Sequence, residues 1–234
     1  MRLDKFISNN SKYSRSEVKK FIKKGILING KLIKDAKYDV NLDNDMVIFE
    51  GIEFKHIENI YIMLNKPQGY VSATRDARDK TVLDLLSDED KIKNIFPVGR
   101  LDKDTEGLIF LTNDGHLSHK LISPQKNIFK KYYVEVDGEL NEEEVKLFES
   151  GVIIDKDYMC KPAILEIIEA KKMKSSAYIQ ISEGKFHQIK KMMKVAGMNV
   201  IYLKRLSIGK LKLDDNLKLG EYRYLNDEEV KELI

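Results

Sequence analysis

The sequence predicts an α+β fold in two parts, and three observations support this prediction. The first 50 residues combine helical periodicity with short β-like runs, and they are rich in lysine and arginine. In the rest of the chain, strand and helix patterns alternate. Hydrophobic residues make up 42 % of the 234, which suits a protein with a buried core. We therefore expect a small N-terminal domain and linker at residues 1–58 and a mixed-sheet domain at 59–234.

The N-terminal part is predicted to hold two helices followed by short strands. Leu3, Phe6 and Ile7 recur at helical spacing, and Ser14 suits the N-cap of a second helix over residues 15–24. Gly25 is typical of a residue that ends a helix. Two β-like runs within residues 26–33 flank an Asn-Gly turn, and residues 46–49 predict a further strand. Residues 51–60 have mixed character and are interpreted as a linker.

The second part is predicted to form one mixed sheet with helices. Short apolar or alternating runs predict strands at residues 61–64, 107–112, 132–136, 163–168 and 177–181. Apolar residues at helical spacing predict helices at residues 117–122, 142–150 and 188–195. No convincing internal repeat is found.

Charge and composition restrict the class of protein. The net charge is only +3, but residues 1–34 hold ten Lys or Arg against two acids, and residues 185–210 hold seven against none. Such blocks are often solvated surfaces, yet two of them favour a phosphate backbone as partner. Cys160 is the single cysteine, which excludes an intramolecular disulfide. Without a long apolar run or a secretory signal, we expect a cytoplasmic protein with no membrane association.

The first 50 residues resemble the S4 RNA-binding domain. The matching features lie at residues 2–4, 14–15 and 25–30, and at Asp45. The resemblance implies that the helix over residues 15–24 lies on structured RNA, with Arg15, Lys19 and Lys23 as contacts. A basic surface helix without a ligand is the alternative, and the agreement of pattern and charge favours RNA binding.

Asp102 is the principal candidate for chemistry. It lies in a polar loop before the strongly apolar run at residues 108–111, and loops supported by rigid strands often carry catalytic groups. Taken alone, such an aspartate is more often a turn or capping residue. The tripeptide Arg-Leu-Asp also occurs at residues 2–4, where Asp4 is better interpreted as a carboxylate at a helix N-terminus.

The full string at residues 99–115 resembles the active-site loop of the RsuA-type pseudouridine synthases. Three further stretches, at residues 63–71, 130–134 and 183–192, resemble motifs of the same family in the same order. Together with the C-terminal tail, the resemblance covers nearly the whole chain. The string around Asp4 lacks the Thr-x-Gly-Leu continuation that follows Asp102.

The resemblance implies a role for each matching residue. Asp102 would be the catalytic carboxylate, and Lys190 would pair with it and keep it ionised. Tyr132 would stack on a uracil flipped out of the RNA. Ile189 would add an apolar wall, and Arg100 would occupy space in the RNA or grip a phosphate. Taken one at a time, a lysine on a basic helix or a tyrosine in a strand needs no role in the reaction. The complete set of motifs favours these roles.

The implied reaction needs no cofactor and no metal, because it rearranges one nucleotide without redox change. His116 and His119, with Asp114 nearby, could suggest metal ligands, but three candidates without a fourth at suitable spacing are weak evidence for a site.

The motif Phe186-His187-Gln188 is similar to the small-subunit branch of the family. This implies position 516 of 16S rRNA as target, and ribosomal RNA or a small-subunit assembly intermediate as partner of a monomeric enzyme. Residues 72–80 match poorly, so 23S rRNA is the alternative substrate. A non-catalytic S4-domain RNA-binding protein is a second alternative, disfavoured because both Asp102 and Lys190 are present.

Overall fold

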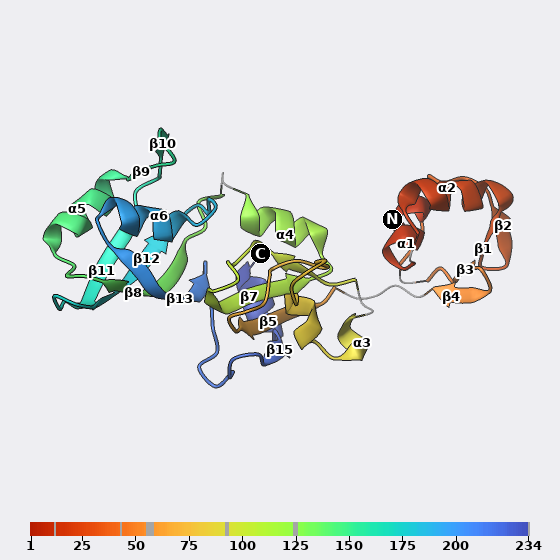
Figure 1. Ribbon diagram of the computed structural model, residues 1–234. Helices are drawn as coiled ribbons and strands as arrows, with labels where there is room; N and C mark the ends of the chain where they lie inside the picture. The colour runs from red at the N-terminus through yellow and green to blue at the C-terminus, as the bar shows by residue number, and fades with distance from the viewer. Residues whose placement is uncertain (12, 43, 55–58, 92–93, 124–125, 234) are drawn as a thin grey trace. The chain divides into compact units, whose positions relative to one another are not determined.

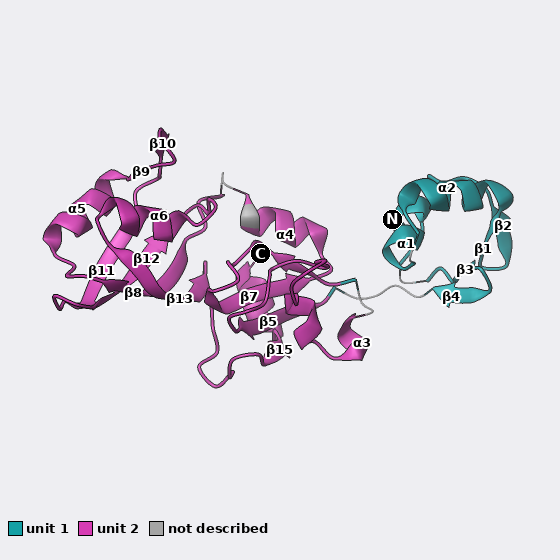
Figure 2. Cartoon of the chain, in the orientation of Figure 1, with its two compact units in different colours: residues 1–59, 92–94 teal, residues 60–91, 95–234 magenta. Residues whose placement is uncertain are grey.

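The computed structural model describes residues 1–234 except 12, 43, 55–58, 92–93, 124–125 and 234. The chain divides into two compact units, residues 1–59 with 92–94 and residues 60–91 with 95–234 (Figure 2). Each unit combines helices with a sheet that is mainly antiparallel, so the predicted α+β class is confirmed. The domain boundary that the sequence suggests, after residue 58, stays a prediction.

Unit 1 begins with the two predicted helices, α1 (Leu3–Asn9) and α2 (Arg15–Lys24). The start of α2 is fixed by a capping box: the backbone N–H of Glu17 donates to the Ser14 hydroxyl, and the Ser14 N–H donates to the Glu17 carboxylate. Gly25 ends the helix with a positive φ of 111°. Both helices bury apolar side chains against the sheet, with Phe6, Val18 and Ile22 in the shared core.

The sheet of unit 1 has four antiparallel strands in the order β2-β1-β3-β4. Its strands are β1 (Ile26–Ile28), β2 (Lys31–Ile33), β3 (Val47–Phe49) and β4 (Ile52–Phe54). The linker interpretation was wrong for β4, because Glu50 and Gly51 both take positive φ and make a tight turn that returns the chain onto β3. Residues 55–58 of that expected linker lie outside the described residues.

Unit 2 is built on a nine-stranded sheet, with the order β11-β12-β8-β13-β7-β5-β15, β14 beside β13 and β6 beside β7 (Figure 1). Its strands are β5 (Tyr61–Lys66), β6 (Phe96–Val98), β7 (Glu106–Thr112), β8 (Lys130–Asp137), β11 (Ile164–Glu169), β12 (Ser175–Ile181), β13 (Asn199–Ile208), β14 (Leu211–Lys212) and β15 (Tyr222–Tyr224). A separate two-stranded ribbon joins β9 (Ile153–Ile154) and β10 (Tyr158–Met159).

The helices of unit 2 lie around this sheet (Figure 1): α5 packs against β11, α6 against β13 and α4 against β6, and α3 lies beside β15, whose Tyr222 hydroxyl donates to Asp90. They are the 3-10 helix η1 (Val82–Leu85), α3 (Asp88–Lys91), α4 (Gly115–Ile122), α5 (Glu142–Ser150), α6 (Gln188–Val195) and α7 (Asp227–Leu233). The helices predicted at residues 117–122, 142–150 and 188–195 are therefore confirmed. In the described part of the chain, no helix has the length and apolar character needed to cross a bilayer.

Strand β13 joins the two halves of the sheet, because it pairs antiparallel with β8 and parallel with β7. At the parallel pair, Gly107 lies beside Arg205, and a Cβ atom at residue 107 would lie 2.2 Å from the Arg205 carbonyl oxygen. The backbone φ of Gly107 is +99° as well. Only glycine allows this close approach, which places the loop before β7 directly against β13.

Candidate active site

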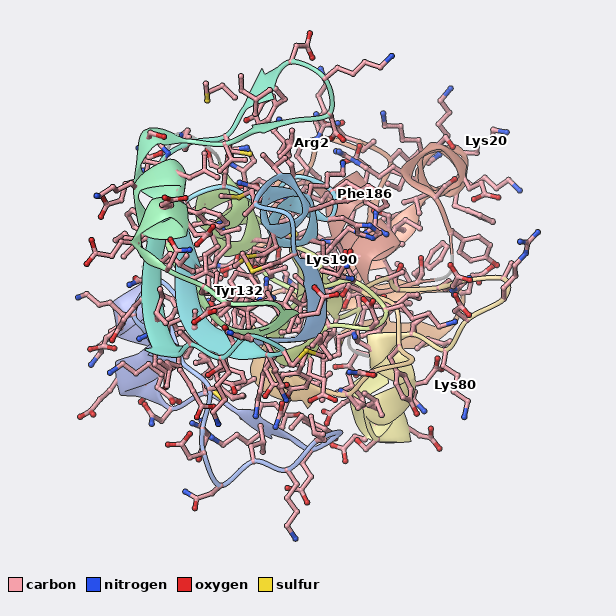
Figure 3. The ribbon with its side chains drawn as sticks, turned by 60° about the vertical axis from the view of Figure 1, so that its left-hand side comes forward. Arg2, Lys20, Lys80, Tyr132, Phe186 and Lys190 are labelled. Atoms are coloured by element: carbon pink, nitrogen blue, oxygen red, sulfur yellow. The ribbon has the colours of Figure 1, made fainter. Side chains whose placement is uncertain are left out.

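A cavity of about 730 Å³ lies in unit 2 where the loop before β7 meets β8, β13 and the start of α6. Its volume suits a small ligand such as a nucleoside. Five of the residues singled out from the sequence line it: Arg100, Asp102, Tyr132, Ile189 and Lys190. Phe186 and Lys190 come from the segment that begins α6, and Tyr132 comes from the sheet (Figure 3).

The loop that carries Asp102 is held by its backbone. Lys66, at the end of β5, is fully buried, and its ammonium group donates to the carbonyl oxygens of residues 67, 102, 103 and 105, at 3.0, 3.0, 3.3 and 2.7 Å. The Ser72 hydroxyl donates to the Leu101 carbonyl at 2.9 Å, and the Gly69 N–H donates to that of Lys103 at 2.8 Å. Main-chain atoms on both sides of Asp102 are thus fixed.

Burial lowers the pKa of Lys66 to about 8 from its ordinary 10.5, although the carboxylates of Asp104, Asp102 and Glu106 oppose the shift. The role of Lys66 was not predicted from the sequence. A lysine next to Pro67, at the end of an otherwise buried strand, was the signal available.

The Asp102 carboxylate is partly exposed and lies beside Lys190 and His187. Lys190 Nζ lies 3.4 Å from Asp102 Oδ2 and 2.5 Å from Asp104 Oδ1, so the ammonium group bridges two carboxylates. The pKa of Asp104 is lowered: burial raises it, and the Lys190 hydrogen bond and charge outweigh that effect. His187 Nε2 lies 3.6 Å from Asp102 Oδ1. The contact of Lys190 with Asp102 was predicted from the sequence, and the contacts made by Asp104 and His187 were not.

Strands β8 and β13 form another wall of the cavity. Tyr132 on β8 and Arg205 on β13 are paired residues, and both line the cavity. Tyr132 is buried, with 6 % of its surface exposed. Arg205 is buried too; its Nε donates to the Leu108 carbonyl at 2.7 Å, and its Nη2 has no hydrogen-bond partner within the described part of the chain. A buried guanidinium with spare donors suits recognition of a polar ligand.

Lys130 is a further basic residue in the cavity lining. Burial and then the charge of Arg205 lower the pKa of Lys130, and the carboxylate of Glu183 opposes them. Neither Arg205 nor Lys130 was predicted as a site residue, because basic residues in a strand pattern are typical of solvent-facing positions.

The segment before α6 is a tight turn fixed by buried polar groups. The Gln188 side chain accepts from the Lys185 N–H at 2.9 Å and donates to Glu183 Oε1 at 2.9 Å. Glu183 also accepts from the Tyr158 hydroxyl at 2.7 Å. Between them, His187 takes the left-handed conformation, with φ 54°. Ile189 is buried at the cavity, and Arg100 is exposed at its edge.

Asp114 caps α4, because its carboxylate accepts from the backbone N–H groups of His116 and Leu117. The aspartate near His116 and His119, the two histidines considered as metal ligands, thus has a structural role as a helix cap. Among the described residues, no group of three or more potential ligands is arranged to hold a metal ion.

The basic residues of unit 1 include an ion-pair cluster. Asp4 is fully buried in the first turn of α1; Arg2 donates to it at 3.0 Å, Arg15 at 2.9 Å, and Lys19 Nζ lies at 3.7 Å. Burial would raise the pKa of Asp4, but the hydrogen bonds from Arg15 and Arg2 outweigh it and hold the pKa below its ordinary value. Arg15 and Lys19 remain half exposed, and Lys23 is exposed on the same helix.

Comparison with known proteins identifies the class to which this fold and site belong. Residues 60–194 match the family described as RNA pseudouridylate synthase, and residues 1–47 match the S4 domain. The chain belongs to the RNA pseudouridylate synthase family, whose members are isomerases. The expected order, an S4 domain before a mixed-sheet synthase domain, is confirmed.

Particular relatives match over nearly their whole length. A Bacillus subtilis protein named RNA pseudouridine synthase YtzG is 47 % identical over 231 residues, covering 98 % of this chain and 97 % of the relative. The Escherichia coli protein named ribosomal small subunit pseudouridine synthase A is 36 % identical over 239 residues, covering all of both chains. A crystal structure of a pseudouridylate synthase aligns with a TM-score of 0.72, at 34 % identity and full coverage of both chains.

Proposed function

We propose that this enzyme converts a uridine of 16S rRNA, at position 516, to pseudouridine, with Asp102 as the catalytic carboxylate. The observation that carries the proposal is the Asp102 carboxylate at the edge of a nucleoside-sized cavity, 3.4 Å from Lys190. The small-subunit target rests on the names of relatives such as the Escherichia coli protein.

The reaction breaks the bond between ribose C1′ and uracil N1 and joins C1′ to C5, while C5 loses a proton and N1 gains one. Asp102 acts on the sugar, as nucleophile at C1′ or as base at C2′, and both roles need an ionised carboxylate. Lys190 stabilises that ionised form by its charge. The Lys66 hydrogen bonds hold the loop so that the carboxylate is in place before the RNA arrives.

The uridine leaves the RNA stack and enters the cavity, where the Tyr132 ring and Ile189 contact the base. Arg205 and Lys130, at the same wall, provide donors for the polar atoms of the nucleotide. Arg100, exposed at the cavity edge, contacts an RNA phosphate. The α2 residues Arg15, Lys19 and Lys23 provide phosphate affinity in unit 1.

The proposed partner is ribosomal RNA, free or in a small-subunit assembly intermediate, bound by a monomeric enzyme. Pseudouridine mapping in rRNA from cells with and without this gene tests the proposal. Loss of the modification at position 516 alone is the expected result. Loss of a 23S modification would contradict the 16S substrate, and an unchanged map would favour a non-catalytic RNA-binding role.

A further inference from the structure

Phe186 is the most exposed phenylalanine or tyrosine ring among the described residues, with 73 % of its surface exposed. It lines the mouth of the cavity that holds Asp102. Exposed apolar rings are unfavourable in water, and the roles assigned above leave Phe186 unused.

Two neighbouring side chains contact the Phe186 ring. It stacks on the His187 ring with a centroid separation of 3.8 Å and an interplanar angle of 20°, and Lys191 Nζ lies 5.3 Å from its centroid. The turn is locked by Gln188, and His187 keeps a left-handed backbone that non-glycine residues seldom adopt. Residues in this conformation cluster at functional sites.

The ring pair lies beside the reacting group, since His187 Nε2 is 3.6 Å from the Asp102 carboxylate. Phe186 is the outer of the two rings, as its exposure shows. A substrate whose nucleotide reaches Asp102 therefore brings its adjoining nucleotides to the cavity mouth, next to Phe186.

A uridine that leaves the stack exposes the faces of its neighbouring bases, and this unstacking costs free energy. Aromatic side chains compensate such a loss, because every base has a π-face on which a ring can stack. The 3.8 Å separation of the two rings is close to the spacing of stacked bases, about 3.4 Å.

We propose that the Phe186–His187 ring pair is a stacking platform that takes the place of the flipped uridine against the base next to it in the RNA. This inference rests on the proposed function. It assigns to Phe186 the role of a positioning residue: the ring stabilises the open RNA, and Asp102 performs the chemistry.

The test measures the single-turnover rate of pseudouridine formation. Its substrate is the shortest rRNA fragment that contains the uridine identified by mapping and is still modified. Phe186→Leu keeps an apolar side chain without a ring and is expected to slow the reaction about 5- to 150-fold, the range of one lost base–aromatic stack. Phe186→Tyr restores a ring and is expected to recover most of that rate. Phe129→Leu, at another exposed phenylalanine that does not line the cavity, is the matched control and should leave the rate unchanged.

The decisive measurement repeats these rates on two RNAs with an abasic site immediately 5′ or 3′ of the target uridine. In one of these two RNAs, the missing base is the one on which the Phe186 ring is proposed to stack. On that RNA, wild type and Phe186→Leu should react at the same rate. If Phe186→Leu slows the reaction equally on all three RNAs, or on none, the platform is excluded. If the modified fragment comes from 23S rRNA, the proposed 16S target is wrong. The rates of wild type and Phe186→Leu can then be compared on that fragment in the same way.

Discussion

Asp4 and Asp102 both follow the dipeptide Arg-Leu, and they lie in opposite environments. Asp4 is fully buried in unit 1 and accepts hydrogen bonds from Arg2 and Arg15. The Asp102 side chain is 26 % exposed at a cavity, and Lys190 and His187 approach its oxygens no closer than 3.4 Å. The first carboxylate is saturated with partners, and the second has capacity left for a substrate.

A carboxylate can be held in place by hydrogen bonds to its own oxygens or by hydrogen bonds to the main chain around it. Asp4 is fixed through its oxygens, which leaves them unable to react. Asp102 is fixed through the carbonyl groups of its loop, which Lys66 binds from the interior. A reactive group needs a rigid position with free atoms, and only the second arrangement supplies both.

The largest expected effect is the loss of chemistry in Asp102→Asn. An amide cannot act as nucleophile or base, so the single-turnover rate of pseudouridine formation should fall at least about 10⁴-fold. RNA binding, measured by filter retention, should persist. Measurable turnover by the purified variant would contradict the assignment of Asp102.

Asp4→Asn is the matched control for Asp102→Asn, because both aspartates end the tripeptide Arg-Leu-Asp. It should leave the rate at saturating RNA unchanged and reduce the free energy of unfolding by about 1–2 kcal/mol, because charged hydrogen bonds from half-exposed arginines are lost. Urea unfolding measures this effect. If Asp4→Asn abolished the saturated rate, the distinction between the two carboxylates would fail.

Lys190→Met tests how far Asp102 depends on charge. Opposite charges 3.4 Å apart attract by about 5 kcal/mol at an effective dielectric constant near 20, and Asp104 shares this attraction. We therefore expect the rate to fall about 10²- to 10³-fold. Lys194→Met, an exposed lysine on the same helix, is the control and should change the rate little. Equal rates for the two variants would show that Lys190 and Asp102 act independently.

The backbone support predicts a pH effect. Lys66 loses its proton near pH 8 in the folded protein, and a neutral amine has fewer donors for four carbonyl groups, so we expect the single-turnover rate to fall about tenfold as pH rises through about 8. The unfolded chain binds this proton up to pH 10.5, so deprotonation favours folding, and the free energy of unfolding should rise with pH between 8 and 10.5 on account of this group. A rate that stays constant from pH 7 to 9.5 would contradict the effect.

The smallest expected effect on rate concerns α2. Replacing Arg15 or Lys19 would also remove partners of Asp4, so Lys20 and Lys23, exposed on the same helix, give the cleaner test of phosphate affinity. Lys20→Gln with Lys23→Gln should reduce the slope of log affinity against log salt by about 1.5, and leave the saturated rate within about twofold. An unchanged slope would mean that these lysines do not contact RNA, and a collapsed saturated rate would mean that unit 1 positions the target.

The sequence predicted elements with strong local signals. Helix α2 has its predicted ends because Ser14, Glu17 and Gly25 fix them through short-range hydrogen bonds and backbone geometry. Strand β13 was missed, because Lys204 and Arg205 interrupt its apolar pattern and the burial of Arg205 depends on partners far away in sequence. Strand β4 was missed because three residues after a turn carry little periodicity.

The site was predictable to the extent that its residues belong to recognisable motifs. The structure brings Asp102, Tyr132, Ile189 and Lys190 to one cavity, as expected from the resemblance. The bridging of Lys190 to Asp104 and the four carbonyl contacts of Lys66 arise from tertiary distances, which residue types alone do not contain.

The hydrogen bonds from Lys66 have a consequence for how this enzyme can diversify. They bind main-chain oxygens, which every residue has, so these contacts do not require the side chains at residues 100 and 103. Those side chains can be exchanged, by natural drift or by directed evolution, while the carboxylate at residue 102 keeps its place. Contacts to a new RNA can therefore be selected around an unchanged Asp102.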